Sequence, residues 1–521
     1  MRTMRQDRGG LEILDGPRSR TSFRRPRRRR NIAALFLKGA AFATGAIVIV
    51  GLWFLATSLL SADPVDLLIV DERTGQPVVG ATVTNEGGRT ATTDENGVAA
   101  IAFEAPERLL VAASGYHAAT YEVGELPRQS GLTLMVNPRV LQGRVVGPRG
   151  VGLFGATVTL GDRTAITGDF GSFELSGVEP GTLEISKMAW EDTEAYWDGD
   201  PGRFDVPIEP FIVRGLRVHT GADLDWIFGL IEGTVINTLV FDTKIEDGQV
   251  VYAMDHDLAR EFDAMTAHYD AEYAIAESHR RGLYTITRVV TFQDYWAAPA
   301  RPEWAILNSE TGEVWRNVKG LPWLDPTNRD AWEYPISIAI EACRMGFDEI
   351  QFDYVRFPTD GNTTVAEYSI GVVTQEVRVQ TVSDFLAEAR ERLHAEGCAV
   401  SADIFGIVLS VPDDQGIGQR IEELSMSADA LSGMLYPSHY GRGWLNLDNP
   451  NDHPYTVVSD ALESASLRNV GGTLMRPWLQ GFSWSPAQVL ESIRAAEENG
   501  GGWLLWNSLS LFDPDWLPPD G

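Results

Sequence analysis

The chain has 521 residues, of which 44% are hydrophobic, and a formal net charge of −30. This length allows about three domains with buried cores. Residues 1–30 hold eleven Lys and Arg against three Asp and Glu, so the acidic excess lies in the rest of the chain. A body this acidic is not expected to bind a nucleic-acid backbone.

The N-terminal region predicts a membrane anchor. Residues 1–32 are polar and rich in arginine, which is typical of a disordered basic arm. The 22 residues Gly39–Leu60 carry no charge, and we expect a transmembrane helix over residues 33–61. Because the run is long for a signal peptide, a retained anchor is favoured over a cleaved signal. Arginines stay on the cytoplasmic side, so the rest of the chain is expected outside a single-pass cell-membrane anchor.

Residues 64–210 contain an internal repeat of about 75 residues. The segment from Thr74 to Thr84 (TGQPVVGATVT) returns as the segment from Pro148 to Thr159 (PRGVGLFGATVT). Short β-branched runs alternate with turn residues, which predicts two small antiparallel β-sandwich modules, 64–137 and 138–210. The repeated pattern resembles the carboxypeptidase regulatory-like (transthyretin-like) β-sandwich family. A stalk is the favoured role, and a binding module is the alternative.

Residues 211–521 form one unit in which strand-like and helical runs alternate, as in a (β/α)8 TIM barrel. The eight predicted strands are Ile212–His219, Val235–Thr243, Leu283–Phe292, Phe347–Phe357, Ala399–Ile407, Ala430–Tyr436, Thr473–Trp478 and Gly502–Asn507. Helices are predicted over 224–232, 257–281, 329–345, 372–396, 418–427, 455–467 and 486–499. The segments 293–328 and 438–454 are predicted loops at the mouth of the barrel. The two cysteines, Cys343 and Cys398, are interpreted as buried free thiols, and a single bridge remains an open alternative.

The central stretch Gly346–Pro358 (GFDEIQFDYVRFP) is an apolar strand that contains Asp353. A carboxylate there is costly unless it is paired or used. It is either half of a core salt bridge or a catalytic group at the carboxyl end of a barrel strand. The next strand carries Asp403, so the two carboxyl groups could face each other. Such a pair is what glycoside hydrolysis requires, and both residues are our catalytic candidates.

Other polar and aromatic residues cluster where the predicted strands end. We expect them to bind a carbohydrate, because flat rings stack on sugars and polar groups bind hydroxyls. These residues are Asp242, Lys244, Arg288, Arg356, Tyr436, His439, Tyr440, Arg476, Trp478, Gln480, Trp506 and Asn507. A metal site built from Asp242, Asp403 and His439 is disfavoured, since the barrel has no HxH or HExxH motif. No metal and no cofactor are expected.

The stretch GFDEIQFDYVRFP resembles the signature of the bacterial "putative glycosyl hydrolase domain" family. The segments RVVTFQD (288–294), SADIFG (401–406), YPSHY (436–440), RPWLQ (476–480) and WLLWN (503–507) agree with it. The resemblance covers residues 211–521 and implies a TIM-barrel relative of the glycosidases. A weaker likeness to chitinase-type barrels matches Asp348 and Asp353 but places Val355 where those enzymes have their acid. The acid is therefore expected from Asp403.

The sequence predicts a membrane-anchored, extracytoplasmic glycoside hydrolase that acts on a polysaccharide or a cell-envelope glycan. The alternative is a carbohydrate-binding envelope protein with a degenerate, non-catalytic barrel.

Overall fold

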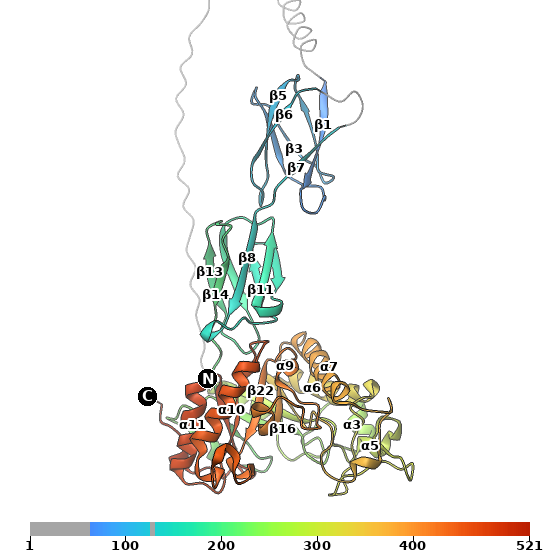
Figure 1. Ribbon diagram of the computed structural model, residues 1–521, viewed down its shortest axis with the longest axis vertical. Helices are drawn as coiled ribbons and strands as arrows, with labels where there is room; N and C mark the ends of the chain where they lie inside the picture. Colours follow the sequence, from blue (N-terminus) through green and yellow to red (C-terminus); the bar gives the residue numbers. More distant parts are fainter. Residues whose placement is uncertain (1–62, 126–130, 521) are drawn as a thin grey trace, which may run out of the picture.

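The computed structural model describes residues 63–125 and 131–520. Two small β-modules follow one another along the long axis of the molecule, and the barrel lies at their end (Figure 1). The predicted basic arm and membrane helix lie outside the described residues. Within the described ranges, no helix has both the length and the apolar character needed to cross a membrane.

The two modules share one strand topology. In the first, β1 (Pro64–Asp71) lies between β4 (Val98–Ala102) and β7 (Leu132–Val136), and in the second, β8 (Val140–Val146) lies between β11 (Ser172–Ser176) and β14 (Phe204–Pro207). The facing sheets have the orders β3-β2-β5-β6 and β10-β9-β12-β13. Their strands are β2 (Thr82–Asn85), β3 (Thr90–Thr92), β5 (Glu107–Ala112), β6 (Ala119–Val123), β9 (Thr157–Leu160), β10 (Arg163–Ile166), β12 (Gly181–Ser186) and β13 (Thr193–Trp197).

The repeat read from the sequence is thus a repeat of structure. Alternate residues are buried in the core of each module, Leu67 and Ile69 in the first and Leu141 and Val145 in the second, as a half-buried strand requires. The prediction of purely antiparallel sheets was wrong, because β1 pairs with β7, and β8 with β14, in parallel. The resemblance of the modules to the carboxypeptidase regulatory-like family stays a prediction.

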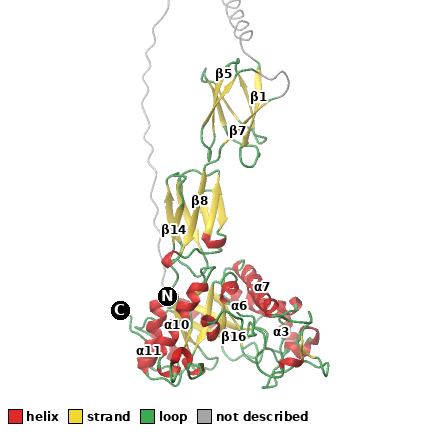
Figure 2. Cartoon of the chain, in the orientation of Figure 1, coloured by secondary structure: helices red, strands yellow, loops and turns green. Residues whose placement is uncertain are grey.

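A closed barrel of parallel strands follows the modules (Figure 2). Around the circle its strands are β15 (Val213–Arg217), β16 (Thr238–Lys244), β17 (Tyr284–Val290), β19 (Glu349–Asp353), β21 (Ala399–Phe405), β22 (Ala430–Leu435), β24 (Trp478–Gln480) and β25 (Gly502–Trp506). The predicted strand 473–478 is split into β23 (Leu474–Met475) and β24, with Pro477 between them. Proline has no N–H to donate to the ladder, which accounts for the break.

Helices surround most of the barrel (Figure 2). They are α2 (Leu224–Ile231), α3 (Asp257–Glu261), α4 (Ala271–Arg280), α6 (Arg329–Met345), α7 (Gln375–His394), α8 (Gly406–Ser410), α9 (Ile421–Leu424), α10 (Pro454–Arg468) and α11 (Pro486–Asn499). The single helix predicted over 257–281 is two, because Asp263 adopts a positive φ of 53° and Asp270 caps a new helix start. The helix predicted over 418–427 is reduced to α9, and Gly418 before it has a φ of 81°.

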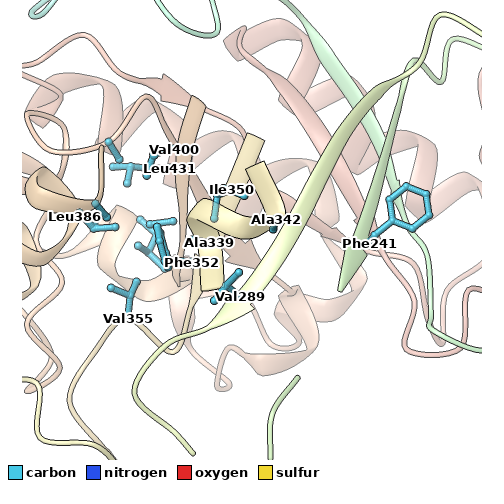
Figure 3. Packing of buried hydrophobic residues seen from close by; sticks show 14 of the residues in the cluster. Phe241, Val289, Ala339, Ala342, Ile350, Phe352, Val355, Leu386, Val400 and Leu431 are labelled. Atoms are coloured by element: carbon cyan, nitrogen blue, oxygen red, sulfur yellow. The ribbon is translucent and has the colours of Figure 1, made fainter. Parts of the chain in front are cut away.

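The main core lies between the strands and the helices around them. Ile350 and Phe352 of β19 are fully buried in this layer, together with Ala339 of α6 and Leu386 of α7 (Figure 3). Successive side chains of a strand point to opposite faces. The same strand therefore directs Asp353 into the barrel.

One disulfide crosses this layer. Cys343, near the end of α6, is bonded to Cys398, just before β21, with the two Cα atoms 6.0 Å apart. The interpretation as free thiols was wrong, and the alternative of a single bridge is confirmed. The sequence alone did not bring the two helix ends together, since 55 positions separate the cysteines.

The second module covers the end of the barrel where the strands begin. Ala430 at the start of β22 and Leu474 at the start of β23 belong to the apolar cluster of that module, with Leu153 and Trp190. The predicted loops 293–328 and 438–454 follow β17 and β22, so they leave the opposite end. In the first loop α5 (Ala297–Ala300) is formed, and β18 (Leu307–Asn308) pairs with β20 (Ala366–Glu367).

Candidate active site

A cavity of about 560 Å³ opens at the carboxyl ends of the barrel strands. Nine of the fourteen residues predicted for the site line it: Arg288, Asp353, Arg356, Asp403, Tyr436, His439, Tyr440, Trp478 and Trp506. They come from six strands or the turns that follow them. The barrel topology therefore brings together residues that are up to 218 positions apart in the chain.

Arg288 of β17 is the cation at the floor of the cavity. Its Nε and Nη2 donate to Oδ2 of Asp353 at 2.9 and 2.6 Å. Nη1 donates to Asp242 at 3.2 Å, and Nη2 also reaches Glu246 at 2.7 Å. The Arg288 side chain is only 2% exposed, so these charge-assisted bonds are shielded from water. One guanidinium thus holds three carboxylates in place.

Asp403 of β21 is the fourth carboxyl group near Arg288, with Oδ2 3.8 Å from its Nε. Trp478 donates its indole N–H to Oδ1 of Asp403 at 2.7 Å. Burial, reinforced by the charge of Asp353, raises the pKa of Asp403 well above its usual range, although Arg288 and the indole oppose this. Among the four carboxyl groups around Arg288, Asp403 is therefore the one whose protonated form is favoured by burial.

The two candidate carboxyl groups are close neighbours. Oδ2 of Asp353 and Oδ2 of Asp403 lie 2.9 and 3.8 Å from the same Arg288 nitrogen, so they cannot be farther apart than the sum of these distances. Carboxyl separations of about 5 Å are typical of retaining glycosidases, and about 6.5–9.5 Å of inverting ones. The upper limit on the distance between the two Oδ2 atoms therefore allows the spacing of retaining glycosidases, and it allows only the shortest spacings of inverting ones.

Two charged residues of the site escaped the sequence analysis. Glu246 lines the cavity as a 43% exposed side chain, and the charge of Arg288 lowers its pKa to about 2. Arg217, at the end of β15, donates to Asp242 at 2.7 Å. Glu246 lies two residues beyond the end of β16, so the rule that functional residues lie at strand ends does not include it. Arg217 is the last residue of β15, and that rule does include it.

Aromatic rings form the cavity walls. Trp478 and Trp506 meet edge to face with centroids 5.2 Å apart, and the guanidinium of Arg217 lies 4.6 Å from the Trp506 centroid. Tyr440 and Trp444 lie 5.3 Å apart on the loop after β22, and both rings are half-buried. Such half-exposed rings can stack on a sugar face. Trp444 was not among the predicted residues, because it lies eight positions beyond Tyr436, where the predicted strand ends.

Three of the five predicted binding residues outside the cavity lining are buried ionic groups. Asp242 is 1% exposed and paired with Arg217 and Arg288. Lys244 pairs with Asp294 at 2.8 Å, because a register shift after Asp242 turns it away from the barrel interior. Arg476 pairs with Glu349 at 2.6 Å, near the strand starts.

The other two are buried or loop-bracing amides. Gln480 accepts from the backbone N–H of Ser438, and Asn507 donates to the carbonyls of Gly481 and Leu511. Both amides thus hold loops of the mouth in place. Their contact with a carbohydrate stays a prediction.

A parallel eight-stranded barrel with adjacent carboxyl groups and aromatic rings at its mouth is the architecture of the TIM-barrel glycosidases. Residues 213–512, more than half of the chain, match the family described as "Putative glycosyl hydrolase domain", and the chain belongs to this family. The resemblance stated from the sequence is confirmed.

Several solved structures are similar to the chain. A hypothetical protein from Ruminiclostridium thermocellum ATCC 27405 is 36% identical, with 36% of this chain and 96% of that chain covered and a TM-score of 0.31. The glycoside hydrolase domain of PgaB (BpsB) from Bordetella bronchiseptica is 12% identical over 58% of this chain and 94% of that chain, with a TM-score of 0.44. Ega3 from Aspergillus fumigatus, in complex with galactosamine, is 9% identical over 59% and 94%, with a TM-score of 0.35. No curated protein matches the chain.

Proposed function

We propose that the cavity hydrolyses glycosidic bonds of a polysaccharide or cell-envelope glycan, with Asp403 as general acid and Asp353 as nucleophile. The observation that carries the proposal is that two adjacent carboxyl groups have different surroundings. Arg288 donates to Asp353 through two nitrogens at 2.9 and 2.6 Å, whereas Asp403 lies 3.8 Å from the same guanidinium and burial raises its pKa. An acid beside an ionised carboxylate is what glycosidic cleavage needs.

The close spacing supports a retaining reaction. The Asp353 carboxylate attacks the anomeric carbon while Asp403 passes its proton to the leaving oxygen, so the glycosidic bond breaks as a glycosyl ester forms. A water molecule then attacks the anomeric carbon of this ester, Asp403 takes a proton from that water, and the bond between the anomeric carbon and Asp353 breaks to release the carboxylate. Over the two steps one water molecule is consumed, the glycosidic bond is hydrolysed, and both carboxyl groups return to their starting protonation states.

Hydrolysis by the two variants Asp353→Asn and Asp403→Ala tests the assignment. We expect each change to lower kcat/KM for a glycan by about 10²–10⁴-fold, measured as released reducing ends. Asp403→Ala should lose much less on a dinitrophenyl glycoside, whose leaving group needs no proton. Asp348→Asn, on the same β-strand segment but at the opposite end of the barrel, is the matched control.

The same assay separates the alternative of a binding protein. A wild-type chain that binds glycans and releases no reducing ends from any of them would make the barrel a non-catalytic carbohydrate-binding domain. Full activity in Asp353→Asn would refute the catalytic pair.

We also propose that the barrel is displayed outside the cell from a single-pass anchor. The uncharged run Gly39–Leu60 after an arginine-rich segment supports the anchor and its orientation. The disulfide Cys343–Cys398 supports an oxidising compartment. Protease added to intact cells or spheroplasts should remove the barrel, and complete protection until lysis would contradict this location.

A further inference from the structure

Arg356 is a buried cation without an acidic partner. Its side chain lines the cavity and the residue is 8% exposed. The barrel's other arginines with so little exposure each pair with a carboxylate: Arg217 with Asp242, Arg288 with Asp353, and Arg476 with Glu349. Among residues 63–125 and 131–520, no acidic oxygen lies within ion-pair distance of the Arg356 guanidinium. Leaving a buried charge uncompensated is costly, so the exception calls for a function.

Three aromatic rings surround this guanidinium. Its central carbon lies 5.2, 4.8 and 4.7 Å from the ring centroids of Trp323, Tyr354 and Phe405. Nη1 donates to the carbonyl of Phe357 at 3.1 Å. The rings attract the cation but accept no conventional hydrogen bond from it. Nε and Nη2 donate to nothing in the described part of the chain, and neither is sealed off from the cavity.

The open edge has the geometry of a carboxylate receptor. Nε and Nη2 form the side of the guanidinium that takes two carboxylate oxygens in parallel. The chain itself uses this edge in that way: Arg378 holds Asp414 at 2.7 and 3.1 Å, and Arg214 holds Glu497 at 2.6 and 3.1 Å. Arg356 presents the same edge to the cavity with no partner.

We infer that Arg356 binds the carboxylate of an acidic sugar, so that the glycan accepted by this cavity carries uronic acids or similar carboxylated residues. This inference rests on the proposed carbohydrate function of the cavity and names the class of its substrate. Arg356 follows Asp353 by three residues; burial lowers the pKa of Arg356, and the nearby charge of Asp353 partly opposes this lowering. The carboxylated sugar therefore lies next to the bond that is cleaved, and Arg356 offsets its repulsion by Asp353.

Binding by the full chain carrying Asp403→Asn tests this without turnover. The probes are hexasaccharides of hyaluronan, alginate and polygalacturonate, each paired with its carboxyl-reduced form, and a neutral-sugar hexasaccharide that carries sulfate. Calorimetry should show at least one carboxylated probe binding roughly ten- to hundred-fold tighter than its reduced form, as expected for a charge-assisted bidentate contact.

The variants assign the preference to one side chain. Arg356→Gln should abolish the difference between a probe and its reduced form, and Arg356→Lys should keep only part of it. Arg494→Gln on α11, whose side chain is 61% exposed and outside the cavity, removes the same charge and should keep the full difference.

Three results would overturn the inference: equal binding of every probe and its reduced form, an unchanged preference in Arg356→Gln, or a preference for the sulfated probe alone. The comparison of probes uses no Arg356 variant, so it holds even if Arg356→Gln fails to fold. Carboxylate-dependent binding without hydrolysis by the wild-type chain would refute the hydrolase proposal and leave this inference standing. Hydrolysis of neutral glycans alone would refute this inference and leave the hydrolase proposal standing.

Discussion

At the scale of single residues, the acid of the proposed reaction is set by a balance around Asp403. Burial and the nearby Asp353 raise its pKa, while Arg288 and the indole of Trp478 lower it. A general acid works only while protonated, so kcat/KM should fall as pH rises through the Asp403 pKa.

The Trp478 hydrogen bond gives a test with a defined sign. Trp478→Phe removes a donor that favours the carboxylate, so the Asp403 pKa should rise further and the basic limb of the pH profile should move up by about one unit. Trp506→Phe is the matched control, because Trp506 touches Trp478 edge-on and makes no bond to Asp403. A basic limb that stays in place or moves to lower pH would exclude Asp403 as the acid.

Lys244 separates residues that hold the barrel from residues that act in its mouth. Its ammonium and Asp294 are both fully buried, 2.8 Å apart. Lys244→Met leaves a buried carboxylate without its cation and should lower the free energy of unfolding by about 3–5 kcal/mol in a denaturant titration. The exposed Lys319→Met should change it little. A lowered kcat/KM with unchanged stability would instead restore Lys244 to the substrate site.

At the scale of elements, the barrel was predictable because its signal is periodic. Eight apolar runs separated by helical segments specify a parallel sheet closed by helices, and Asp353 stands out within such a run. The features that the sequence did not predict arise from local irregularities of the strands and turns. The register shift after Asp242 redirects Lys244, Pro477 divides a strand, and Glu246 reaches the cavity from a turn. The register shift and the position of Glu246 leave no periodic mark, since both depend on contacts between distant segments. Pro477 is a local signal inside the predicted strand 473–478, where a proline breaks the ladder.

The disulfide is an element-level constraint that can be tested alone. It joins the end of α6 to the segment before β21 and closes a loop of 55 positions. On the loop-entropy model, Cys343→Ser with Cys398→Ser should lower the free energy of unfolding by up to about 4 kcal/mol. Because the bridge lies near the strand starts, kcat/KM at low temperature should be unchanged. Equal stability with and without reductant in the wild type would contradict this expectation.

At the scale of the whole molecule, the second module and the barrel form a continuous core, whereas the two modules meet through polar contacts. Ala430 and Leu474 of the barrel are buried in the module's apolar cluster, and Lys187 and Asp429 are buried between the two domains, 3.9 Å apart. Between the modules, Arg73 and Glu174 are 44% and 39% exposed at 2.8 Å. Exposed pairs of this kind contribute about 1 kcal/mol or less. The second module is therefore a structural part of the barrel, whereas the role of the first module as a stalk stays a prediction.

Two truncated chains test this division. A chain of residues 138–521 should keep the thermal unfolding temperature of the barrel, because the first module shares no apolar cluster with the second module or the barrel. A chain of residues 211–521 uncovers the apolar face around Ala430 and Leu474, so its barrel should unfold several degrees lower and aggregate more readily. Calorimetry measures both unfolding temperatures.

Hydrolysis of a soluble oligosaccharide should be equal in the two chains well below unfolding, because the covered end of the barrel is opposite the cavity. Equal unfolding temperatures would show that the module contributes nothing to the barrel, and a lower kcat/KM in the shorter chain would mean that the module acts on the mouth from the far end.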